Sequence, residues 1–146
     1  MNTKNFLIGG LVGGVVYFLL GWLFYGNLMH QYFADHPGTA TNVDRVMDQF
    51  EWWALGLGNL LFGFLLAYVF AKSGVSTLTS GLITGGIVGL LACAAINFTM
   101  YGTTNITSKH AVAADIATFT VISAIAGAVI GAVNGMLNRT AVAVKV

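Results

Sequence analysis

Four long apolar runs dominate the pattern of hydrophobic and polar positions along the chain. They cover residues of about 6–28, 53–71, 78–100 and 112–137. A helix needs about 20 apolar residues to cross the hydrocarbon core of a bilayer, and each run comes close to or exceeds that length. The pattern therefore predicts an all-α integral membrane protein with four transmembrane helices in a single domain.

The connections between these runs also carry structural signals. Proline and glycine in His36-Pro37-Gly38 stop any helix that continues from the first run. In the segment of about 42–52, apolar residues recur at helical spacing and charged residues occupy the other face. We expect an amphipathic helix there, capped at Thr41-Asn42 and lying at the outer interface or extending the second span.

A short glycine motif occurs twice, 76 positions apart. Gly9-Gly10-Leu11-Val12-Gly13 is echoed by Gly85-Gly86-Ile87-Val88-Gly89, and the same register aligns Tyr25-Gly26 with Tyr101-Gly102. This repetition suggests two tandem helical hairpins related by a pseudo-twofold axis along the membrane normal.

Composition strengthens the membrane assignment. The 146 residues are 57% hydrophobic and 8% charged, whereas soluble domains carry about 25% charged residues. A single cysteine, Cys93, excludes a disulfide framework within the chain. The chain has no polybasic run, so we expect no nucleic-acid partner.

The distribution of basic residues predicts the orientation. With four spans, one side holds Lys4, Lys72, Arg139 and Lys145, and the other holds Arg45, Lys109 and all five acidic residues. Basic residues concentrate on the cytoplasmic side of membrane proteins. We therefore expect a multi-pass protein of a bacterial inner membrane with both termini in the cytoplasm, and a first run that is retained rather than cleaved.

Small residues recur every four positions along the spans. Close backbone approach at such stripes drives helix association in lipid, as in GxxxG motifs. The stripes either pack the four helices of one chain or also form a homo-oligomer contact. The expected helix-packing residues are Gly10, Gly14, Gly63, Gly81, Gly85, Gly89, Gly127, Gly131 and Gly135.

Three asparagines, Asn59, Asn97 and Asn134, lie within the spans. Amides in hydrocarbon seek partners, so they either join neighbouring helices or line a polar cleft. No charged residue or histidine lies near the middle of a span. That absence disfavours a coupled transporter, intramembrane acid–base catalysis and an axial haem ligand.

A candidate outer-face site gathers the titratable residues of the expected outer side. Their spacing matches no metal-binding motif, so a solvated acidic loop is the favoured interpretation over a metal or hydrolytic site. Asp48 and Glu51 are expected to pair with Lys109, and Asp115 suits the first turn of the fourth helix. The candidate residues are His36, Asp48, Glu51, Lys109, His110 and Asp115. No catalytic, cofactor-binding or metal-binding residue is assigned, and no cofactor is expected.

The run Gly21-Trp22-Leu23-Phe24-Tyr25-Gly26, with the glycine-rich spans after it, resembles small four-span bacterial membrane proteins of uncharacterised function. The resemblance implies the layout but no activity or site. We expect a non-enzymatic protein that binds a lipid or small molecule, or an accessory subunit of a larger membrane complex. The alternatives are a transporter or channel formed by a homo-oligomer and, third, a lipid-modifying enzyme at the outer interface.

Overall fold

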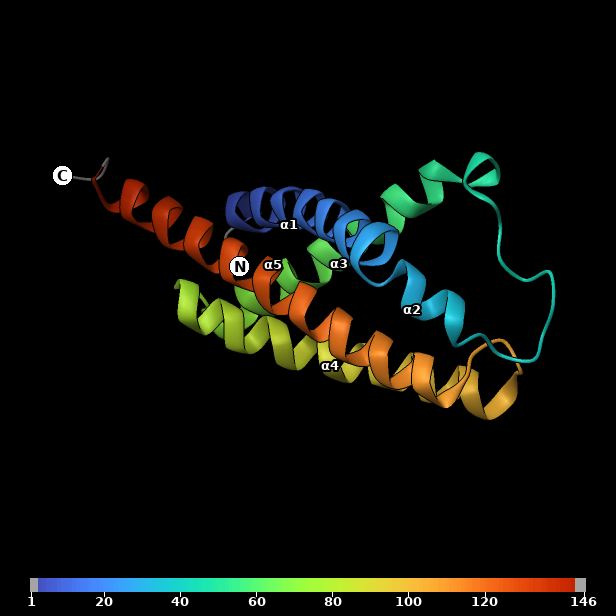
Figure 1. Cartoon of the computed structure of the whole chain (residues 1–146). Coiled ribbons are helices and arrows are strands. Elements are labelled where there is room, and N and C mark those ends of the chain that lie inside the picture. Colours follow the sequence, from blue (N-terminus) through green and yellow to red (C-terminus); the bar gives the residue numbers. More distant parts are fainter. Residues whose placement is uncertain (1–2, 144–146) are drawn as a thin grey trace.

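The computed structural model describes residues 3–143, which are almost entirely helical (Figure 1). Four helices in this part are long and apolar enough to cross a membrane, which confirms the predicted all-α, multi-pass architecture. The first span continues through a π-helical segment, η1, and the short helix α2 and 3₁₀ turn η2 follow it. The elements are α1 (Thr3–Leu23), η1 (Phe24–Leu28), α2 (His30–Asp35), η2 (Met47–Gln49), α3 (Trp52–Ser73), α4 (Leu78–Thr103) and α5 (Lys109–Ala143).

The long helices form two antiparallel pairs, α1 with α3 and α4 with α5, and α5 also packs along α1. Helix α3 barely touches α4. One end of the bundle holds the start of α1, the turn 74–77 and the end of α5, and we call it the terminal end (Figure 1). The opposite end holds the connections 29–51 and 104–108, and we call it the loop end.

Glycines bring the backbones of α4 and α5 together. A Cβ atom added at Gly85 would collide with the carbonyl oxygen of Ser123 and lie 2.9 Å from the Cα of Gly127. Gly81 and Gly131 are just as close to the opposite backbone. Since little hydrophobic force acts between helices in lipid, this close packing is the main source of cohesion in the pair.

Glycines also allow close backbone packing between α1 and α3. A Cβ at Gly63 would run into the backbone of Gly10, Gly13 and Gly14, and one at Gly14 would lie 2.8 Å from the Cα of Leu60. All nine glycines expected at helix contacts lie against another helix or against the turn 74–77. Their geometry accounts for packing within one chain.

Antiparallel contact between α1 and α5 joins the two pairs. Tyr17 of α1 is buried with Leu66 and Phe70 of α3 and with Ile122 and Ile130 of α5. The share of residues buried inside the protein is highest for α5 among the four spans. Helix α5 is therefore the element around which the others are arranged.

Side-chain hydrogen bonds mark this α1–α5 seam at three depths in the described residues. Each joins a residue of the first span to one of the last. The bonds run from Asn5 Nδ2 to Asn138 Oδ1 (2.8 Å), from Tyr17 OH to Ser123 Oγ (2.9 Å) and from Tyr25 OH to Asp115 Oδ1 (2.5 Å).

The two halves of the chain are not equivalent in their mutual packing. An exact twofold that maps α1 onto α4 would also map the α1–α5 contact onto an α4–α3 contact, yet only the former is extensive. Tyr25 bonds to Asp115, whereas its sequence counterpart Tyr101 is 46% exposed. The glycine motifs of both halves lie at helix contacts, but among the described residues the bond from Tyr25 to Asp115 has no counterpart at Tyr101.

The amphipathic helix expected over 42–52 does not form. Before α3, that segment is irregular apart from η2, and Asn42, expected as part of the cap, has a left-handed φ of 57°. Its apolar side chains Val43, Val46 and Met47 are exposed. A short helix is marginal unless its apolar face packs on another surface, and these residues meet no such surface in the part of the chain that the structure describes.

Candidate functional site

A hollow of about 430 Å³ opens at the loop end, between the segment after α2 and the α4–α5 connection. We call it the loop-end hollow. It is lined by Pro37, Gly38, Thr39, Tyr101, Thr104, Asn105, Thr107, Ser108 and Lys109.

Backbone contacts between the segments 36–40 and 105–108 fix the shape of the hollow. The amides of Thr39 and Ala40 both donate to the carbonyl oxygen of Asn105, each at 3.0 Å. Ser108 Oγ donates to the carbonyl oxygen of His36 at 2.7 Å. Gly38 is required at this crossing, because a Cβ there would collide with the backbone of the α4–α5 connection. We refer to these contacts as the latch.

The chemistry of the hollow suits an anion. Lys109 is the first residue of α5, and Ser108 Oγ accepts a hydrogen bond from the amide of Ala111 at 3.2 Å. The positive end of a long helix dipole therefore faces this region. Thr107 Oγ1 is buried without a hydrogen-bond partner, and no carboxylate is among the lining residues.

Two histidines of the candidate outer-face site meet at the loop end. The rings of His36 and His110 have centroids 5.4 Å apart, and His36 stacks on Tyr32 at 4.3 Å. Nδ1 of His36 lies 2.8 Å from the carbonyl oxygen of Tyr32. This stack flanks the latch because His36 also accepts the Ser108 hydroxyl through its backbone.

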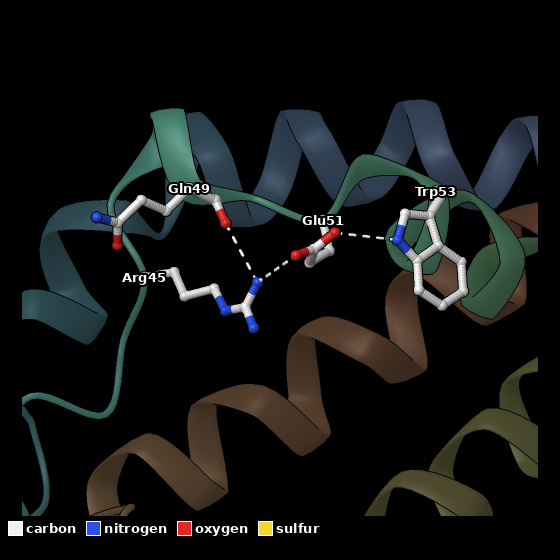
Figure 2. A network of polar contacts seen from close by, with 4 residues as sticks. All are labelled: Arg45, Gln49, Glu51 and Trp53. Carbon is white, nitrogen blue, oxygen red and sulfur yellow. Dashed lines mark hydrogen bonds and ion pairs between the residues drawn. The ribbon is translucent and has the colours of Figure 1, made fainter.

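The acidic part of the predicted outer-face site lies apart from Lys109. Glu51 forms an ion pair with Arg45 at 3.0 Å and accepts a hydrogen bond from Trp53 Nε1 at 3.0 Å (Figure 2). This local pairing replaces the expected contact with Lys109, since Arg45 is only six positions away in the same connection. Asp48 is exposed in η2.

A second polar cluster forms inside the bundle around Asp115. Its Oδ1 accepts the hydroxyl of Tyr25, and its Oδ2 accepts the amide of Asn97 at 2.6 Å and the thiol of Cys93 at 3.4 Å. Asp115 lies in the second turn of α5 rather than in the expected first turn. We call this meeting of η1, α4 and α5 the Asp115 junction.

The junction combines residues that the sequence placed in different groups. Asn97 was expected in a polar cleft and Asp115 on the outer face, yet their side chains are in direct contact. Cys93 and Tyr25 were not anticipated. Cys93 lies four residues before Asn97, on the same face of one helix, and this spacing is the sequence signal that pairs them.

The other two asparagines serve separate contacts. Asn59 donates to the carbonyl oxygen of Leu55 in its own helix at 2.8 Å. Asn134 is 5% exposed and donates to the carbonyl oxygen of Val75 at 3.3 Å, while its Oδ1 is buried without a partner. Each asparagine thus bonds to a different part of the bundle.

Metal-binding residues do not gather in the described part of the chain: no three His, Cys, Asp or Glu side chains there lie close enough to hold a metal ion together. The chain matches no known family model, and neither a curated protein nor a solved structure shows significant similarity to it. The arguments for function therefore rest on the geometry of the hollow within a four-span membrane protein.

Proposed function

We propose that this membrane protein is a non-enzymatic lipid-binding protein, and that the loop-end hollow receives the anionic headgroup of a phospholipid. The observation that carries the proposal is the hollow itself. It combines a lysine, hydroxyl and amide groups and the N-terminus of α5, with no carboxylate among its lining residues.

The position of the hollow along the bundle corresponds to the level of lipid headgroups in a bilayer. Lys109 and Ser108 lie just before the apolar part of α5, and Tyr101 lies near the end of α4 with its ring partly exposed. Tyrosines of this kind occupy the level of lipid headgroups. Near the same end of α4, exposed apolar side chains such as Phe98 offer apolar surface for an acyl chain.

The proposal includes an orientation. Among the described residues, Lys4, Lys72 and Arg139 belong to the terminal end, and Arg45 and Lys109 to the loop end. Lys145, which also entered the sequence argument, lies outside the described residues. We place the terminal end in the cytoplasm and the loop end in the periplasm of a bacterial inner membrane.

Native mass spectrometry of gently extracted protein tests the lipid proposal. The wild-type protein is expected to retain a phospholipid in defined stoichiometry, and to take up phosphatidylglycerol in preference to phosphatidylcholine. Lys109→Gln is expected to lose this adduct because it removes the only lysine that lines the described hollow.

Lys72→Gln is the matched control, because Lys72 lies at the terminal end over the ring of Tyr68, 5.8 Å from its centroid. It is expected to retain the lipid. A lipid-free wild-type protein, or equal retention by Lys109→Gln and the wild type, would contradict the proposal.

A further inference from the structure

The loop-end hollow offers more room and more hydrogen-bonding groups than a phosphate group can use. Its volume of about 430 Å³ falls within the range of roughly 300–1,000 Å³ that is typical of small-molecule sites. A phosphate group alone leaves most of that volume unfilled. The remainder of a bound headgroup therefore has to suit the side chains that line the hollow.

Three lining side chains have their hydrogen-bonding groups free. The hydroxyls of Thr39 and Tyr101 and the side-chain amide of Asn105 form no hydrogen bond with the part of the chain that the structure describes. In the wall of the same hollow, Thr107 Oγ1 is buried and also lacks a partner. An unpartnered buried hydroxyl is costly, so this region gains from a ligand that brings polar groups of its own.

These free groups include an acceptor that a phosphate cannot satisfy. The oxygens of a phosphodiester accept hydrogen bonds from Lys109 and from hydroxyls, but a phosphodiester has no hydrogen to donate. Whichever way its amide is turned, Asn105 presents one oxygen that only accepts. A headgroup that pairs with every free group of the hollow therefore carries donors beside its phosphate.

Hydroxyl groups suit the hollow better than an ammonium group as these donors. The ammonium of an ethanolamine or serine headgroup would lie close to Lys109, and no carboxylate among the lining residues would offset the repulsion. A hydroxyl carries no charge, and it can also accept hydrogen bonds from Thr39 and Tyr101.

We propose that the loop-end hollow selects a phospholipid whose phosphate carries a polyol, either glycerol or a larger polyhydroxy group. Lys109 lies beside the phosphate, and the amide of Asn105 determines specificity by bonding to the hydroxyls of the polyol. This inference rests on the proposed lipid-binding function and adds the chemical class of the headgroup.

Competition among three synthetic lipids with identical acyl chains tests the inference by native mass spectrometry. They are phosphatidylglycerol, phosphatidylpropanol and phosphatidylcholine. Phosphatidylpropanol keeps the charge and carbon skeleton of phosphatidylglycerol but lacks the free hydroxyls of its glycerol headgroup. The wild-type protein is expected to bind phosphatidylglycerol about tenfold more tightly than phosphatidylpropanol, because the hydroxyls add hydrogen bonds in the hollow.

Asn105→Ala is expected to bring this ratio close to one and to keep the preference of both anionic lipids over phosphatidylcholine. That retained preference shows that the hollow of the variant is still formed. Asn59→Ala is the matched control, because the amide of Asn59 bonds within α3 and lies outside the hollow. It is expected to behave as the wild type.

The outcomes separate this inference from the proposed function. If the wild type binds phosphatidylglycerol and phosphatidylpropanol equally, and both better than phosphatidylcholine, the polyol inference is overturned and the anionic-headgroup proposal stands. If neither anionic lipid is preferred over phosphatidylcholine, the proposed function itself fails. An unchanged ratio in Asn105→Ala would overturn the role of Asn105.

Discussion

In the α1–α5 seam, a hydrogen bond between two hydroxyl groups helps to fix the register of one helix pair against the other. The side chains of Tyr17 and Ser123 are almost completely buried and bond to each other at 2.9 Å. In lipid, an apolar helix surface can rotate or slide with little penalty, because lipid tails are as apolar as its neighbours. The bond between the two hydroxyls favours the register in which they meet.

Tyr17→Phe removes this bond and leaves the hydroxyl of Ser123 without its interhelical partner. We expect the free energy of unfolding to fall by about 1 kcal/mol, within the range measured for interhelical hydrogen bonds. Denaturant titration in mixed micelles measures the change. Tyr68→Phe is the control, since Tyr68 is 49% exposed on α3; equal losses in the two variants would show that the bond to Ser123 does not matter.

Tyr25→Phe tests the loop end of the same seam. The hydroxyl of Tyr25 donates to a carboxylate, so we expect a larger loss than for Tyr17→Phe, about 1.5 kcal/mol. The same titration measures it. The double variant Tyr25→Phe/Asp115→Asn should lose less than the sum of the single variants, because both remove one contact. Strict additivity would argue against a direct interaction.

At the scale of elements, neighbouring glycines in one helix can differ in how much room they leave for a side chain. Gly85 faces the backbone of α5, whereas a Cβ at Gly86 would lie 3.4 Å from the Cβ of Ala124, an ordinary contact distance. The glycine content of a span therefore does not by itself identify its packing face.

Gly85→Ala is expected to lower the stability of the α4–α5 pair by about 2 kcal/mol, because the added methyl group forces the backbones apart. Gly86→Ala should be neutral or stabilise by up to about 1 kcal/mol, since alanine is the better helix former. Unfolding monitored by circular dichroism distinguishes the two. The opposite ranking would mean that α4 presents a different face to α5.

Gly38→Ala is expected to open the latch while the spans remain folded. Hydrogen exchange should show loss of protection at the amides of Thr39 and Ala40, which donate to Asn105. Gly102→Ala is the control at the same end of the bundle, because a Cβ there meets nothing within 4 Å. Unchanged protection in Gly38→Ala would show that the latch tolerates a side chain.

The sequence was sufficient for the spans and for their pairing in two hairpins, but not for the way the hairpins dock. The length of each apolar run specifies a membrane helix, and the observed spans agree with the expected ones to within a few residues. The docking of α5 on α1 was not predictable, because apolar residues surround each span and do not distinguish lipid from protein. The Asp115 junction was not predicted, because its members come from three elements far apart in the chain. The helix predicted for the segment 42–52 was wrong, because helical spacing of apolar residues does not form a helix without a surface to pack on.

At the scale of the whole molecule, the bundle has two chemically different ends. The histidine pair and the hollow lie at the loop end, and the terminal end holds the tight turn 74–77. The proposed lipid site lies at the loop end, so the orientation in the membrane decides which side of the bilayer supplies its ligand.

Cysteine labelling in intact cells tests that orientation. A cysteine introduced at Ala40 should react with a membrane-impermeant thiol reagent, whereas one at Ser73 should react only after the cells are opened. The native Cys93 is buried, so it contributes little background. Labelling of Ser73→Cys in intact cells would reverse the proposed topology.

The α1–α5 seam also has a consequence for how the protein is made. Its hydrogen bonds join residues separated by 133, 106 and 90 positions. During synthesis the first helix therefore enters the membrane well before the last one leaves the ribosome, and until then its tyrosines have no partners on α5. Contacts this distant in sequence form late. The newly made α1–α3 pair is thus an intermediate in which the hydroxyls of Tyr17 and Tyr25 lack their hydrogen-bond partners. Insertion of α5 into the membrane completes the bundle.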